Sequence, residues 1–103
     1  MPLTVPGIIA ALRKIKRDAK VGEEGHIPIV AIDGTPRALG RIRNGEQDAT
    51  VSQDPFEMGR LAIRSALSAI RGESLPAEQL LPPILVTKEN VDDPALWGNQ
   101  FKF

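Results

Sequence analysis

Cysteine is absent from this 103-residue chain, and aromatic side chains are scarce at 4% of the residues. Without cysteine there is no disulfide, no thiol catalysis and no thiolate-ligated metal. The net charge favours no class of partner either, because thirteen Lys and Arg offset thirteen Asp and Glu. A neutral chain with few aromatics and no recognition motif lacks the electrostatic footprint of a nucleic-acid-binding protein. We therefore expect no nucleic acid partner and no redox chemistry.

A long apolar run is missing as well. The first nine residues contain two prolines and no basic residue, and their apolar stretch is too short for a secretory signal or a membrane span. On these grounds the chain has no export signal of its own, and we expect it in the cytoplasm if Met1 is the true start.

Residue types that carry chemistry are few. His26 is the one histidine and lies in a polar loop, and no acidic cluster has the spacing of a metal site. The serines have no histidine at a strand end to activate them, and no glycine-rich phosphate fingerprint follows a strand. The sequence therefore predicts no enzyme, no catalytic residue, no metal and no cofactor. His26 is expected to be a solvated loop residue.

What the sequence does contain is the balance of one globular domain, 42% hydrophobic and 25% charged. Ile8, Leu12 and Ile15 recur at helical spacing among basic residues, which predicts an amphipathic helix over residues 7–20. A short apolar run over residues 27–32 then predicts a strand that is buried on both faces of a parallel sheet.

A helix should begin directly after that strand. Thr35 can cap it, Pro36 can occupy its first turn, and Asn44–Gly45 would end it. The segment is thus a strand, a tight turn and a helix in succession.

The same pattern repeats after a short β-prone run over residues 49–53. Asp54 stands at the N-cap and Glu57 at the third helical position. In this arrangement the side chain of each residue can accept a hydrogen bond from the backbone amide of the other. The helix should run through residue 70. One apolar stripe follows from its periodicity, made by Phe56, Gly59, Ile63, Ala66, Leu67 and Ile70.

Strands that alternate with helices imply parallel pairing with right-handed crossovers. A third strand is expected at residues 84–87, after a proline-rich connection, and the tail beyond it should be irregular. The predicted fold class is therefore α/β, a three-layer Rossmann-like parallel sheet of about three strands and three helices. Such a small sheet has two open edges, which suggests that part of the architecture lies outside this chain.

Asp33 and Gln53 stand at the ends of the first two predicted strands. Ligands bind beyond the carboxyl ends of parallel strands, and a carboxylate beside a carboxamide suits vicinal hydroxyls. Such a pair binds and does not catalyse. Two structural alternatives remain open, an Asx-type turn closed by Asp33 and a backbone contact made by Gln53 at the strand-to-helix bend. Trp97 could stack on a sugar, but we favour its packing the tail down.

Three linked segments are IVAIDGTP at residues 29–36, DATVSQDPFEMG at residues 48–59 and LVTKENVD at residues 85–92. In this order and spacing they resemble the C-terminal third of ribose-type periplasmic sugar-binding proteins of ABC transporters. The resemblance implies a type I periplasmic binding fold and reversible binding of a monosaccharide or sugar alcohol between two lobes. It also implies delivery to a membrane permease and a periplasmic parent protein. Asp33 and Gln53 match family positions that contact sugar hydroxyls.

The resemblance also implies that the site is partial. A family asparagine that contacts sugar would fall at about Met1, and the whole first lobe has no counterpart in 103 residues. Two other interpretations stay open, the effector-binding half of a LacI-type regulator and a truncated interaction domain without ligand binding.

The same resemblance divides the chain into four parts. Residues 1–53 would belong to the C-terminal lobe, 54–83 would carry a helix that docks on the missing lobe, 84–92 would be a return strand and 93–103 a tail. Without that lobe the helix either repacks onto the sheet of this chain or pairs with a second copy. We expect a homodimer.

Overall fold

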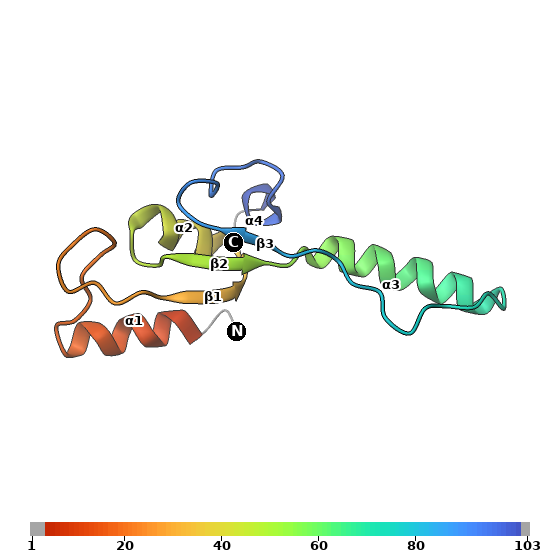
Figure 1. The fold of residues 1–103 in the computed structure, drawn as a ribbon, viewed down its shortest axis with the longest axis horizontal. Coiled ribbons are helices and arrows are strands. Elements are labelled where there is room, and N and C mark those ends of the chain that lie inside the picture. The colour runs from red at the N-terminus through yellow and green to blue at the C-terminus, as the bar shows by residue number, and fades with distance from the viewer. Residues whose placement is uncertain (1–3, 102–103) are drawn as a thin grey trace.

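The computed structural model describes residues 4–101, which form two unlike parts (Figure 1). The body, residues 4–53 and 84–101, is an α/β unit. The arm, residues 54–83, projects from one end of it. The molecule measures 58 × 25 × 21 Å, and its radius of gyration of 17.4 Å exceeds the roughly 13 Å of a compact chain of this length. Within the described residues no helix is long and apolar enough to cross a membrane.

The sheet of the body has three strands, β1 (Val30–Asp33), β2 (Ala49–Ser52) and β3 (Ile84–Val86), in that order. β1 and β2 are parallel and β2 and β3 antiparallel. The predicted α/β class and three strands are confirmed, but the sheet is mixed. The arm leaves from the carboxyl end of β2 and returns at that same end, so the next strand runs in the opposite direction without a crossover.

Helices α1 (Thr4–Lys14) and α2 (Pro36–Asn44) belong to the body. As predicted, the Thr35 hydroxyl caps α2 by accepting from the Ala38 amide at 3.1 Å, and Gly45 follows it with a φ of 79°. α1 is shorter than the sequence predicts, because Lys16 has a φ of 60° that breaks the helix. The tail, expected to be irregular, contains a fourth short helix, α4 (Trp97–Gln100). Met1 and residues 102–103 lie outside the described residues.

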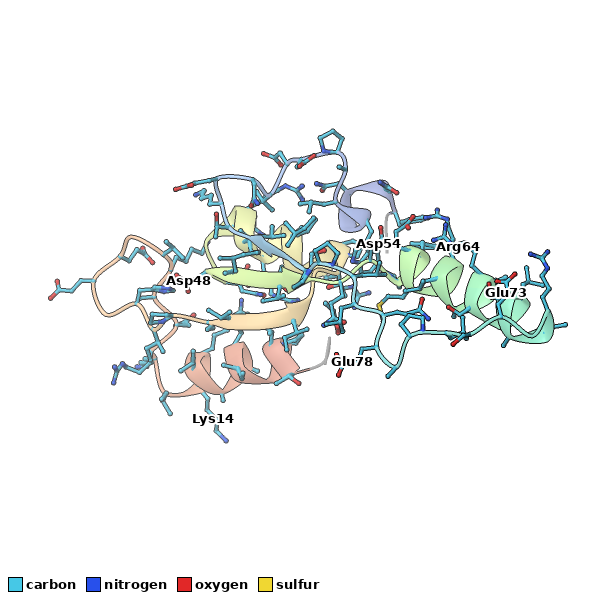
Figure 2. The ribbon with its side chains drawn as sticks, turned by 45° about the vertical axis from the view of Figure 1, so that its right-hand side comes forward. Lys14, Asp48, Asp54, Arg64, Glu73 and Glu78 are labelled. Atoms are coloured by element: carbon cyan, nitrogen blue, oxygen red, sulfur yellow. The ribbon has the colours of Figure 1, made fainter. Side chains whose placement is uncertain are left out.

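The arm consists of α3 (Pro55–Ile70) and a return segment that runs back along it. Figure 2 shows Asp54 where α3 begins, Arg64 farther along it and Glu73 at the far end. The Asp54 carboxylate accepts from the amides of Phe56 and Glu57 at 2.9 and 3.2 Å, which confirms the predicted N-cap. Glu57 pairs with Arg60 instead of returning a bond to Asp54. None of the sixteen residues of α3 is buried, so the helix does not repack onto the sheet.

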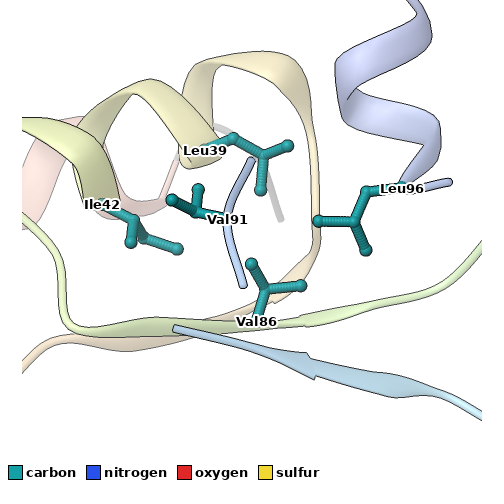
Figure 3. Close-up of a cluster of buried hydrophobic side chains, with 5 residues drawn as sticks. All are labelled: Leu39, Ile42, Val86, Val91 and Leu96. Carbon is teal, nitrogen blue, oxygen red and sulfur yellow. The ribbon is translucent and has the colours of Figure 1, made fainter. Parts of the chain in front are cut away.

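The core lies entirely in the body. Figure 3 shows Leu39 and Ile42 of α2 packed against three side chains of the C-terminal part, Val86, Val91 and Leu96. In a second cluster, Val5 and Ile9 of α1 pack against Ile29, the residue just before β1. Each such side chain contributes about 1.5–3 kcal/mol when it is fully buried. The buried core therefore belongs to the body, and no side chain of the arm is part of it.

One face of the sheet is uncovered. Ile32, Val51 and Leu85 are neighbours across the three strands, and Ile32 and Leu85 remain 53% and 59% exposed. The sequence predicted a first strand over residues 27–32 buried on both faces, and this is wrong. The strand starts at Val30, and Val30 and Ile32 face solvent because none of the described helices packs on that side.

Candidate functional site

Asp33 and Gln53 lie together at one edge of the sheet. Asp33 ends β1 and Gln53 follows β2, and because these strands are parallel their carboxyl ends meet. The Gln53 amide donates to the Asp33 carbonyl oxygen at 3.4 Å. Both residues line one groove with Thr35, Pro55, Met58 and Trp97. The structure thus brings the two predicted site residues into a single depression.

The side chains of Asp33 and Gln53 are not engaged elsewhere. Within residues 4–101 neither makes a hydrogen bond or an ion pair. The Asx-type turn is therefore not formed by Asp33, and Thr35 caps the helix instead. The Gln53 carboxamide likewise makes no backbone contact at the bend. Asp33 is half-buried and Gln53 exposed, so both can present polar atoms to a ligand in the groove.

The backbone at Asp33 is strained. Its φ of 105° lies in a region that costs a side-chain-bearing residue about 1–3 kcal/mol. The Trp97 indole holds this conformation by donating to the Asp33 carbonyl oxygen at 3.0 Å. At Gly34, which has a φ of 71°, an added Cβ would lie 2.6 Å from the Ser52 hydroxyl oxygen. The turn is thus pressed against β2, and this fixes where the Asp33 carboxylate emerges.

Trp97 is an anchor of the tail. It is 8% exposed and makes an edge-to-face contact with Phe56, with ring centroids 6.3 Å apart. Phe56 in turn stacks on Phe101 at 4.6 Å. This arrangement agrees with the packing role that we favoured for Trp97. Trp97 also lines the groove.

Three further residues line the groove that the sequence does not single out as site residues, Thr35, Pro55 and Met58. Thr35 was assigned only as a helix cap. Met58 is an apolar residue of α3 that lies outside the predicted stripe. An apolar side chain in that position is the sequence signal that could have pointed to a second contact surface on the helix. Gln53 and Met58 also line a second groove, between α3 and the return segment at residues 79–83. Gln53 therefore stands where the body and the arm meet.

His26 differs from its prediction as a solvated loop residue. Its Nδ1 lies 2.8 Å from the Ala19 carbonyl oxygen, and its Nε2 lies 2.8 and 3.0 Å from the Asp48 carboxylate oxygens. Asp48 also accepts from the Ile29 amide at 2.8 Å. The hydrogen bond to Ala19, and then the contact with Asp48, raise the pKa of His26. Asp48 and Asp54 mark opposite ends of β2 in Figure 2, so this cluster is remote from the groove.

Comparison with known proteins gives a consistent family. A family model described as the periplasmic binding protein domain matches residues 3–74. A Rhizobium meliloti protein named for rhizopine binding is 37% identical over 65 residues, which is 63% of this chain and 21% of that protein. The D-allose-binding periplasmic protein of Escherichia coli (strain K12) is 30% identical over 76 residues, 68% of this chain and 24% of its own length.

Solved structures agree with the sequence relatives. The Caulobacter myo-inositol binding protein, bound to myo-inositol, superposes with a TM-score of 0.71 at 30% identity, over 86% of this chain and 28% of its own. A periplasmic solute binding protein from Actinobacillus succinogenes with bound D-allose also gives 0.71, at 24% identity, over 84% and 29%. The chain therefore spans between about a fifth and a third of the length of these proteins.

Proposed function

Since this chain belongs to the periplasmic binding protein domain family, we propose that it carries one edge of the sugar site of an ABC-transporter binding protein. The observation that supports this most is the placement of Asp33 and Gln53. Their unengaged side chains share one groove at the carboxyl ends of neighbouring parallel strands. Ligands of open α/β sheets bind at such ends. We propose a monosaccharide or sugar alcohol as the ligand.

The chemistry of the pair suits hydroxyl groups. The Asp33 carboxylate can accept from two adjacent hydroxyls, and the Gln53 carboxamide can both donate and accept. Hydrogen bonds to a charged group contribute about 1.5–3 kcal/mol each. Binding of this kind is reversible and breaks no covalent bond. We propose that the parent protein acts in the periplasm and hands the sugar to a membrane permease.

We propose that the site is completed from outside the chain. The groove around Asp33 and Gln53 is open to solvent, whereas sites for small ligands usually bury most of the ligand surface. The relatives are three to five times longer than the matched region, so they have further chain with which to enclose a ligand. The exposed helix of the arm supports its docking on a complementary lobe. The body would then be part of the C-terminal lobe.

Calorimetric titration with pentoses, hexoses and polyols, including D-allose and myo-inositol, tests this proposal. We expect weak binding by the chain alone, with dissociation constants in the millimolar range, because only one side of the ligand is contacted. Asp33→Asn and Gln53→Ala should each weaken binding about tenfold or more. Gln79→Ala, which changes an exposed glutamine of the arm, should leave it unchanged. The assignment would be overturned if no sugar in the panel bound. It would also be overturned if Gln79→Ala weakened binding as much as Asp33→Asn or Gln53→Ala.

A further inference from the structure

The apolar stripe of α3 has the spacing of a helix–helix seam. Five of its six members, Phe56, Gly59, Ile63, Ala66 and Ile70, are separated alternately by three and four residues, and the sixth, Leu67, flanks them. These five residues are called the seam. This is the heptad pattern by which one helix packs along another. Ile63 and Ile70 are 66% and 81% exposed, although isoleucine is among the residues most often buried.

The seam is the side of α3 that its own chain leaves open. The opposite side, with Leu61 and Ser65, faces the return segment, and the Ser65 hydroxyl donates to Gln79 at 3.2 Å. Phe56 at the start of the seam already contacts Trp97 and Phe101. The uncovered part is therefore the stretch from Gly59 to Ile70.

The chain as a whole exposes more surface than a compact monomer of its mass. A compact monomer of 11.2 kDa exposes about 5,700 Å², whereas this chain exposes 7339 Å², an excess of roughly 1,600 Å². The arm and the bare sheet face share this excess. A specific protein interface buries about 800 Å² on each partner, so half of the excess would suffice.

We propose that, when the chain is alone, the α3 seam pairs in antiparallel orientation with the α3 seam of a second copy. Large and small residues alternate along the seam, and an antiparallel register sets them against one another. Gly59 lies opposite Ile70 of the second copy, and Ile63 lies opposite Ala66 of the second copy. Each layer then combines one branched side chain with one small residue, so the helices approach closely. A parallel pair would instead set Gly59 against Gly59 and leave gaps.

Charge and shape are compatible with this pairing. The formal net charge is zero, so two copies do not repel one another as a whole. Arg60, which flanks the seam, is already paired with Glu57. Antiparallel helices also place opposite ends of their dipoles side by side. Because α3 projects away from the sheet, the two bodies would lie at opposite ends of the dimer (Figure 1).

Sedimentation equilibrium at micromolar concentration tests the dimer. We expect the unmodified chain to be dimeric, and Ile63→Glu to weaken dimerisation about 100-fold or more, because a charge enters the centre of the interface on both copies. The control Leu80→Glu changes a side chain that is 84% exposed on the return segment, outside the seam, and should remain dimeric. Circular dichroism checks that both variants keep the body folded. A monomeric parent chain, or an Ile63→Glu variant that dimerises normally, would overturn the proposal.

Cysteine cross-linking tests the register, because the chain has no cysteine of its own. Disulfides form only when the two Cα atoms are within about 7 Å. A mixture of Ile63→Cys and Ala66→Cys chains should therefore oxidise mainly to the mixed dimer. Ala66→Cys alone should cross-link poorly. Efficient cross-linking of Ala66→Cys to itself would show a parallel pair and contradict the proposed register. The proposal rests on the seam alone, so its failure leaves the sugar assignment untouched.

Discussion

The body and the arm of this protein are built from equally good local signals but differ in what covers them. α2 and α3 both begin with a side-chain cap and a proline. In α2 the side chains of Ala38, Leu39 and Ile42 are buried, whereas no residue of α3 is buried. Local sequence thus determines where a helix starts, but tertiary packing provides most of its stability. The contrast shows that good local signals alone leave α3 without the burial that stabilises α2.

The largest expected effect comes from paired truncations in the two regions. Leu39→Ala removes a side chain with 0% exposure and should lower the free energy of unfolding by about 2–5 kcal/mol. Leu67→Ala removes a half-exposed side chain of the arm and should cost less than about 0.5 kcal/mol in dilute, monomeric protein. Urea denaturation followed by Trp97 fluorescence measures both. Equal losses would mean that the arm packs on the body in solution.

A substitution at the N-cap of α3 tests whether the arm can be destabilised without affecting the body. Asp54→Ala removes the acceptor of two amide hydrogen bonds and should destabilise α3 by about 1 kcal/mol. Because α3 contributes no buried residue, the unfolding midpoint of the body should not move. Hydrogen exchange resolved by residue measures this, with faster exchange expected only in the arm. Loss of protection in α2 would contradict the independence of the two parts.

Within the body, the strained backbone at Asp33 predicts that stability and sugar binding respond in opposite directions to a glycine substitution. Asp33→Gly should raise the free energy of unfolding by about 1 kcal/mol, because glycine tolerates a positive φ, while sugar binding is lost. Asp33→Ala is the matched control, since it removes the carboxylate but keeps the strain. It should give no gain in thermal stability. A stabilised alanine variant would show that the carboxylate, and not the backbone, is the costly feature.

The smallest effect concerns pH. Both ring nitrogens of His26 face acceptors, so both hydrogen bonds require the protonated imidazole. The pKa of His26 is raised above its ordinary 6.5 by the Ala19 carbonyl and by Asp48. The protonated contact therefore contributes its full stability below about pH 6.5, and this is lost as the pH rises through the raised pKa. Thermal unfolding at several pH values measures this slope, and His26→Gln should flatten it. A slope that persists in His26→Gln would assign the effect to another group.

Sequence patterns predicted what depends on short-range chemistry. The caps at Thr35 and Asp54 and the end of α2 at Gly45 follow from residue types within a few positions. The placement of Asp33 and Gln53 also followed, because parallel neighbours bring their carboxyl ends together.

Features that depend on distant contacts could not be predicted. The direction of β3 depends on the arm returning at the edge from which it left. The His26 contact joins residues 22 positions apart in the chain, and Trp97 reaches Asp33 across 64 positions. The exposure of Val30 and Ile32 reflects an uncovered sheet face, which no local pattern of apolar residues reveals.

The most direct test of the sugar site is a residue-resolved NMR titration of the unmodified chain with D-allose and with myo-inositol. The predicted result is a set of amide shifts confined to the turn at Asp33–Gly34 and to Gln53, with α1 and the His26 loop unaffected. Shifts that centre on the His26 loop, or no shifts even at the solubility limit of each sugar, would contradict the assignment of Asp33 and Gln53 as sugar ligands.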